Sequence, residues 1–296
     1  MAIDTPFRIT PALDILLRGT ESLPVGLFHL HVATAEQLCR LHHAMGSKKF
    51  VKAKLRILED HGFIQHDELP TKRVRSEYHY MMDKAGMEYL WELGMHRDRS
   101  FRTAKEVHTN SQFIIHSLEI NDVLISAAML HKAAPACYLH GFMHERVFKR
   151  SPCSFSWQDK SDRVIPDAFL EFRRSMPGGS ERRLPLLLEH DRGTEYQQAF
   201  REHIRAYIGF LRSGAYKERF ATERITIVFT TFKGEYRRDQ MREWTKAELK
   251  WMGESEDIGF NFVFAATANP PEPIKLWLEP CWYTPYSDQP ISLLGV

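Results

Sequence analysis

Three acidic residues lie at the ends of two predicted neighbouring strands. Asp167 follows Pro166, and Glu189 and Asp191 close the apolar run Leu184 to Leu188. An antiparallel pair brings the beginning of one strand close to the end of the next, so Asp167 and Glu189 can converge. Glu189 and Asp191 are two residues apart and project to the same face of their strand. Hard oxygen donors of this kind suit Mg²⁺ or Mn²⁺.

A divalent cation at this position would serve phosphate chemistry. It could lower the pKa of an attacking water and neutralise charge on a scissile phosphate. We therefore expect Asp167, Glu189 and Asp191 to be metal ligands and catalytic residues. The alternative is a salt-bridge cluster of Asp191, Arg192, Glu195 and Arg201 at the start of the next helix, where acids favour the helix dipole.

A second group of residues is basic. Five cations with no acid among them fall on one short predicted helix: Lys48, Lys49, Lys52, Lys54 and Arg56. The apolar stripe expected on that helix consists of Phe50, Val51, Leu55 and Leu58. The cations therefore point away from the core, either as a DNA-binding face or as an ordinary solvated face.

Composition indicates a soluble globular protein. The 296 residues are long enough for two domains, and 40 cations against 38 acids leave a formal charge of only +2. Nucleic-acid binding must therefore depend on local basic patches. The four cysteines form no CxxC pair, which disfavours a zinc knuckle and a disulfide framework. We expect no membrane-spanning segment and a location in the cytoplasm.

The first part of the chain, residues 1–95, is predicted to form helix, helix, helix, hairpin and helix. The expected elements are helices at Ala12 to Leu17, Thr34 to His43 and Ser47 to Asp60, then strands from Phe63 and over Ser76 to Met82 around a polar tip at Leu69 to Arg73. Thr34 and Ser47 are the candidate N-caps. Residues 96–110 are polar and weakly periodic, which is typical of a linker.

Residues 111–296 read as a mixed sheet flanked by helices. Helices are expected at Ser111 to Ala134, Glu195 to Leu211 and Tyr236 to Met252. Strands are expected at Cys137 to Lys149, Phe155 to Trp157, Val164 to Arg173, Leu184 to His190, Arg224 to Phe232, Phe260 to Ala266 and, at an edge, Ile274 to Tyr283. This order predicts an α/β (α+β) fold.

The first 95 residues resemble a winged helix-turn-helix in the order and spacing of their elements. That resemblance implies that the third helix enters the major groove and that the hairpin tip contacts the flanking backbone. The DNA-binding residues would be Lys48, Lys49, Lys52 and Arg56 on the helix and Lys72, Arg73 and Arg75 on the wing. Winged helices also serve as protein-protein modules, which is the competing interpretation.

The acidic motif resembles the PD-(D/E)xK nuclease superfamily, with Pro166-Asp167 and Glu189 matching and Asp191 at the position of the lysine. In some relatives the missing cation comes from the following helix, where Arg201 or Arg205 stands here. The resemblance implies a catalytic role for Arg205 and phosphate contacts for Arg192 and Arg201. Arginine is a poor base, because it stays protonated.

The whole layout is similar to the replication-relaxation family of plasmids and other mobile elements. The residues that carry this resemblance are His116 with Asn121-Asp122, Pro166-Asp167, the string Leu188 to Glu195, and Arg205 with Tyr207. It implies a DNA-binding protein in replication or DNA relaxation, with double-stranded DNA and other replication or mobile-element proteins as partners. Two hypotheses follow: a Mg²⁺- or Mn²⁺-dependent endonuclease, or a regulator or complex subunit whose nuclease-like domain is not catalytic.

Overall fold

The chain folds into two compact units. The computed structural model describes residues 7–8, 22–43, 46–69, 77–92, 94, 111–176 and 178–295. We call Ile9–Ile125 the first unit, and Ser126–Val296 with Met1–Arg8 the second unit. The division falls within the long helix α7, Ser111–Ala133.

Some sequence expectations fall on parts of the chain outside the described residues. They are the linker at 96–110, the helix Ala12 to Leu17, and the wing residues Lys72, Arg73 and Arg75. For these positions the sequence predictions stand as they were made.

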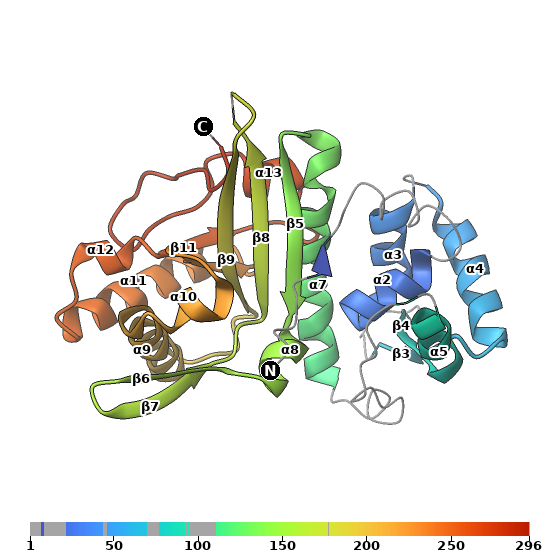
Figure 1. Ribbon diagram of the computed structural model, residues 1–296, viewed down its shortest axis with the longest axis horizontal. Coiled ribbons are helices and arrows are strands. Elements are labelled where there is room, and N and C mark those ends of the chain that lie inside the picture. The colour runs from blue at the N-terminus through green and yellow to red at the C-terminus, as the bar shows by residue number, and fades with distance from the viewer. Residues whose placement is uncertain are drawn as a thin grey trace. The chain divides into compact units, whose positions relative to one another are not determined.

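The first unit combines helices with a small antiparallel sheet (Figure 1). Its helices before α7 are α2 (Ser22–Leu30), α3 (Ala35–His42), α4 (Lys48–Asp60) and α5 (Lys84–Glu92). Its strands are β2 (Val32–Thr34), β3 (Ile64–Glu68) and β4 (Tyr78–Met82), in the spatial order β2-β4-β3. The predicted hairpin and the helices on both sides of it are present, whereas α2 and β2 were not predicted.

The two predicted helix caps differ in outcome. The Oγ1 of Thr34 accepts a hydrogen bond from the backbone N–H of Gln37 (3.2 Å), and the Oε1 of Gln37 accepts one from the backbone N–H of Thr34 (3.1 Å). This reciprocal capping box confirms Thr34 as the N-cap of α3. Ser47 is the N-cap of α4, but its side chain makes no capping hydrogen bond. The predicted start of α4 at Ser47 is confirmed, without a hydrogen bond from the serine side chain.

Buried polar contacts attach the N-terminal part of α7 to the rest of the first unit. The Nδ2 of Asn121 donates to the backbone oxygens of Leu30 (3.0 Å) and Val32 (2.6 Å). The Nε2 of Gln37 donates to the Oδ1 of Asp122 (2.9 Å). Asn121 and Asp122 belong to the family resemblance described above, and here both act in holding the fold together.

The first unit should lose stability in acid through His29 of α2. Burial, followed by the nearby charge of His42, lowers the pKa of His29 from 6.5 to about 3. The unfolded chain therefore binds a proton that the folded chain excludes, so the free energy of unfolding falls as pH drops below 6.5 towards 3. The limiting slope is about 1.4 kcal/mol per pH unit, and we expect less because His29 keeps some exposed surface.

Urea unfolding at pH 7.5, 6 and 5 measures this effect. In the variant His29→Gln the free energy of unfolding should fall less steeply with decreasing pH than in the unchanged chain. The control variant His61→Gln, which changes an exposed histidine of the same unit, should show the same slope as the unchanged chain. Equal slopes for His29→Gln and the unchanged chain would contradict the assignment.

The second unit is built around a six-stranded mixed sheet (Figure 1). Its spatial order is β1-β5-β8-β9-β10-β11, antiparallel from β1 to β9 and parallel from β9 to β11. The strands are β1 (Phe7–Arg8), β5 (Cys137–His144), β8 (Ala168–Ser175), β9 (Glu181–Asp191), β10 (Thr226–Thr231) and β11 (Phe262–Ala266). A separate hairpin pairs β6 (Cys153–Trp157) with β7 (Lys160–Val164). The predicted mixed α/β (α+β) fold is confirmed.

Helices cover both faces of this sheet. Besides the C-terminal part of α7, the helices described in this unit are α8 (Glu145–Arg150), α9 (Gln197–Ser213), α10 (Ala215–Phe220), α11 (Glu235–Trp251), α12 (Glu256–Gly259) and α13 (Pro273–Trp277). On one face, aromatic and aliphatic side chains of α9 and α11 share a core with Phe169 and Leu187. On the other, Trp277 packs on Phe172 with ring centroids 4.9 Å apart. Leu186 to Leu188 are buried, as expected for a strand covered on both sides.

Two strands predicted in the second unit are partly helical. The strand expected over Cys137 to Lys149 ends at His144, and α8 follows at once. The edge strand expected over Ile274 to Tyr283 begins instead with the helix α13, because Pro273 stands in its first turn, where proline is well accommodated. The second strand of the β6-β7 hairpin was not predicted.

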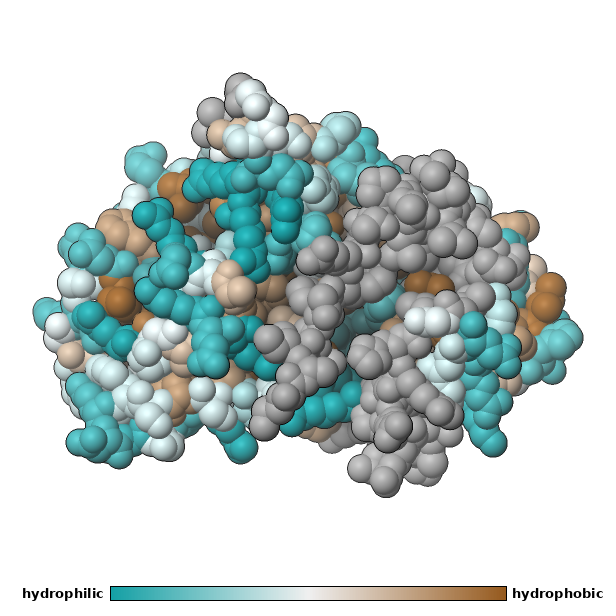
Figure 2. Space-filling model, viewed as in Figure 1, coloured by the Kyte–Doolittle hydropathy of each residue, from teal (hydrophilic) through white to brown (hydrophobic). Residues whose placement is uncertain are grey.

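The helix α7 corrects the expectation that no segment is long and apolar enough to cross a membrane. By length and composition it passes that test, but 67% of its most apolar window is buried inside the protein. Burial of this kind is typical of the core helix of a soluble protein. On the visible face of the second unit, hydrophilic side chains predominate and hydrophobic ones are scattered (Figure 2).

Candidate functional site

Three acids lie where adjacent strands of the second unit end. Glu145 directly follows β5, Asp167 directly precedes β8, and Glu189 lies near the end of β9. The strand register aligns them, because His144 pairs with Ala168 and Ala168 pairs with Leu188. The sheet therefore presents one carboxylate from each of three neighbouring strands at the same end.

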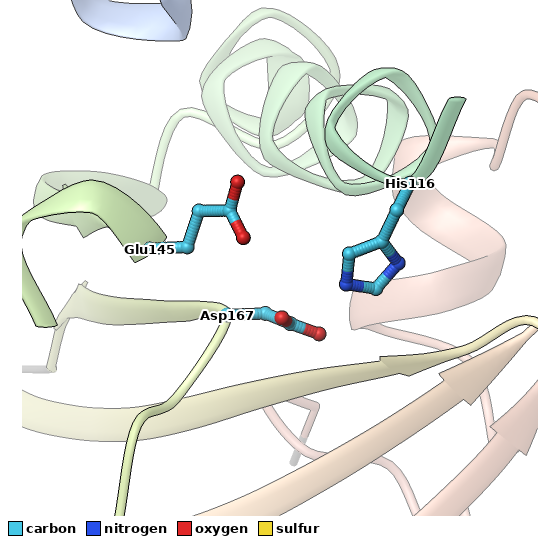
Figure 3. Close-up of side chains that lie close together, drawn as sticks. All are labelled: His116, Glu145 and Asp167. Carbon is cyan, nitrogen blue, oxygen red and sulfur yellow. The ribbon is translucent and has the colours of Figure 1, made fainter. Parts of the chain in front are cut away.

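Asp167 is fixed by the backbone of the adjoining strand. Its N–H donates to the carbonyl of Leu188 (3.0 Å), and its Oδ2 accepts the N–H of His190 (2.7 Å). One carboxylate oxygen of Asp167 lies within 4.8 Å of one of Glu145 (Figure 3). The register places the start of β8 beside the end of β9, as predicted, but the acid found close to Asp167 is Glu145. Figure 3 also labels His116, which α7 carries within the first unit.

Glu145 was missed in the sequence because its segment read as a continuing strand. It is buried, with 5% of its surface exposed, and its Oε2 accepts a hydrogen bond from the Nζ of Lys149 (2.6 Å) one helical turn on. Burial opposes its ionisation, but His144 and Lys149 together hold the pKa of the carboxyl below its ordinary value. Glu145 is thus a carboxylate at neutral pH despite its burial.

Glu189 points into the protein towards α9. It is 7% exposed, its Oε1 accepts a hydrogen bond from the hydroxyl of Tyr207, and the Nε2 of His203 lies 3.5 Å from the same oxygen. Burial raises the pKa of Glu189, and the negative charge of Asp167 acts in the same direction. Tyr207 has its pKa raised well above 10, by burial and then by Glu189.

His203 carries a positive charge beside these acids. Burial would lower its pKa, but the charge of Glu189 outweighs burial and raises the pKa to about 9. His203 is therefore the basic side chain of α9 that lies beside Glu189, whereas Arg201 and Arg205 contact Glu248. His203 and Tyr207 are four residues apart, a spacing that puts both on one helix face.

Asp191 is bound by an arginine instead of facing an open site. The Nε and Nη2 of Arg237 donate to its two carboxylate oxygens, each at 2.7 Å, and Nη2 also donates to the carbonyl of Glu195 (3.0 Å). Asp191 also accepts the N–H of Gly193 (2.8 Å), whose φ of 73° lies in the left-handed region that glycine adopts readily. Asp191 therefore forms a salt bridge, as the alternative interpretation expected, but its partner is Arg237 and not Arg192 or Arg201.

The two arginines predicted on α9 contact a different acid. The Nε of Arg201 donates to Glu248 (2.7 Å), and the Nε of Arg205 donates to the other oxygen of the same carboxylate (2.8 Å). Glu248 of α11 has no exposed surface, so both arginines hold α9 against α11. Arg192 is half-buried directly after Asp191.

The basic helix α4 of the first unit presents part of its charge to solvent. Lys48, Lys49, Lys52 and Arg56 are all exposed, and the Nζ of Lys48 also lies 2.8 Å from a carboxylate oxygen of Glu36. Val51 and Leu55 are buried as predicted. Phe50 was assigned to the same apolar stripe, but 54% of its surface is exposed, and that assignment was wrong.

The close carboxylates of the acidic site are chemically suited to bind a divalent cation. Glu145 and Asp167 supply hard oxygen donors, which suit a divalent cation that keeps several waters and binds phosphate oxygens. The sequence analysis named Tyr207 through the family layout, whereas Glu145 and His203 were missed. Glu145 and His203 have no local pattern that distinguishes them from surface residues.

Comparison with known proteins gives one match. A family model described as Replication-relaxation matches residues 27–224, which include the last four residues of α2, the basic helix α4 and all of the acidic site. No curated protein and no solved structure matches the chain.

Proposed function

Because the chain belongs to the replication-relaxation family, we propose that it acts on plasmid or mobile-element DNA and binds the duplex through helix α4. Membership implies a role in the replication or relaxation of such DNA. The observation that carries the proposal is the exposed row Lys49, Lys52 and Arg56 on a helix with no acid before Glu59. We place this activity in the cytoplasm, with other replication proteins as further partners.

The order of elements in the first unit supports a winged helix-turn-helix. The helices α2, α3 and α4 precede the hairpin β3-β4, and β2 adds a third antiparallel strand. In that fold α4 would be the helix that enters the major groove. The residues joining β3 to β4 include Lys72, Arg73 and Arg75, which we assign to the wing on the sequence alone.

Salt-dependent binding tests the DNA proposal. Each phosphate contact releases counterions, so the variant with both Lys52→Ala and Arg56→Ala should reduce the slope of log affinity against log salt by about two. The matched control is Lys246→Ala with Lys250→Ala, two exposed lysines at the same spacing on α11. Fluorescence anisotropy on a labelled duplex measures both. Equal loss in the two variants, or none in either, would reject α4 as the DNA contact.

A metal-dependent activity is the second function we propose, and the pairing of Glu145 with Asp167 favours it. These two carboxylates would hold Mg²⁺ or Mn²⁺, which would neutralise phosphate charge and lower the pKa of a bound water. Asp167 is oriented for this by the N–H of His190. His203, kept cationic by Glu189, would face the phosphate in the role that a lysine has in the PD-(D/E)xK superfamily.

Supercoiled plasmid incubated with the protein and Mg²⁺ or Mn²⁺ distinguishes an enzyme from a binding protein. Nicked or relaxed product that EDTA abolishes supports the endonuclease. Tight DNA binding without any product supports the alternative of a regulator or complex subunit whose acidic site is not catalytic.

A further inference from the structure

The exposed face of α4 carries two parallel stripes of different chemistry. The first is cationic and consists of Lys49, Lys52 and Arg56. The second is apolar and consists of Phe50, Ala53 and Ile57, all exposed. Both follow the same spacing of three and then four residues, so at about 100° per residue they run side by side along the helix.

The apolar stripe is a feature of the surface and not of the core. Phe50 is 54% exposed and Ile57 is 57% exposed, while Val51 and Leu55 of the same helix are fully buried. The Nζ of Lys54 lies 4.4 Å from the centroid of the Phe50 ring, which orients the ring and leaves most of the side chain open to solvent. Neighbouring exposed apolar side chains on a charged helix indicate a contact surface.

We propose that the stripe Phe50, Ala53 and Ile57 contacts the 5-methyl groups of thymines in the major groove. The proposal rests on the proposed function, since it needs α4 in that groove. The thymine methyl is the apolar group that the major groove displays, and small aliphatic or aromatic side chains recognise it. The cationic stripe then holds phosphates, and the apolar stripe selects sites with thymine at the positions it meets.

The charge pattern favours DNA over a second copy of the chain as the occupant of this face. In a twofold contact each copy would present the same helix face, so the row Lys49, Lys52 and Arg56 would meet or closely flank its own equivalent. No acid lies between Lys48 and Leu58 to neutralise that charge. A duplex offers phosphates to the cations and methyl groups to the apolar side chains.

Removal of single thymine methyl groups tests the inference. A duplex bound tightly by the full chain is selected from a randomised pool and resynthesised with uracil in place of one thymine at a time. We expect binding about fourfold weaker for each contacted methyl group that is lost. The variant Phe50→Ala with Ile57→Ala should bind thymine and uracil duplexes equally and keep the salt slope of the unchanged chain.

The control and the opposing outcomes separate this inference from the DNA-binding proposal. Phe113→Ala removes a side chain of the same unit that is also 57% exposed, and it should leave the preference for thymine unchanged. If uracil substitution changes nothing at any position while the Lys52 and Arg56 variants still weaken binding, the methyl contact is wrong and the DNA-binding proposal survives. A change from dimer to monomer in light scattering for Phe50→Ala with Ile57→Ala, without an effect of uracil, would assign the stripe to a second copy.

Discussion

Replacing Arg237 by alanine should lower the free energy of unfolding by about 3–5 kcal/mol. Arg237 and Asp191 are 8% and 9% exposed, and two hydrogen bonds of 2.7 Å join them. Without the guanidinium, Asp191 would be a buried carboxylate with its main counter-charge removed. The carbonyl of Glu195 would lose its donor as well.

Thermal and urea unfolding measure this loss. A change of this size corresponds to a fall of about 10 °C in the melting temperature of a unit this large. Lys217→Ala removes an exposed pair with Glu223 and should leave the unfolding curve nearly unchanged, because solvent screens such a pair. Adding Asp191→Asn to Arg237→Ala should cost less than the sum of the single changes, because both act on one contact. Near-native stability of Arg237→Ala would return Asp191 to the set of candidate metal ligands.

Replacing Asp167 by asparagine should remove divalent-cation binding from the acidic site. Asparagine keeps an oxygen that can accept the N–H of His190, so the local fold should persist while the charge is lost. Changes in groups that only support a ligand typically cost 10–100-fold in metal affinity, so loss of a ligand itself should cost at least about 100-fold. Any nicking that depends on Mn²⁺ should disappear with it.

Calorimetric titration with Mn²⁺ and the plasmid assay provide the two measurements. Glu145→Gln should weaken Mn²⁺ binding in the same way, since its carboxylate lies within 4.8 Å of that of Asp167. Asp162→Asn changes an exposed acid of β7 and should leave both measurements unchanged. Unaltered Mn²⁺ affinity in both Asp167→Asn and Glu145→Gln would place any metal elsewhere.

Much of the fold could be predicted because its signals are local. The capping residue Thr34 marks a helix start, and the apolar run before Glu189 marks a buried strand. The same local signals gave a wrong prediction where a short helix and a strand have similar patterns of apolar residues. After His144 the apolar residues Val147 and Phe148 follow, so periodicity could not separate the end of β5 from the start of α8, and Glu145 was missed.

The partners of charged side chains could not be predicted, because they depend on which helix face meets the sheet. Arg201 and Arg205 looked suitable for the acidic site on spacing alone. His203 is two residues from each, which is about 200° around the helix, so the arginines reach Glu248 while His203 reaches Glu189. A sequence shows which residues share a helix face, but tertiary packing decides which face covers the acids.

The contacts of Asp191 and Gly193 bear on how related sequences are interpreted. In the string from Glu189 to Glu195, an aspartate, a glycine and a main-chain carbonyl fasten the turn between β9 and α9 through Arg237. These residues therefore have a structural task in the turn whether or not the neighbouring acids take part in any reaction. The presence of this string in a related sequence would indicate the same turn, and it would not by itself indicate a catalytic site.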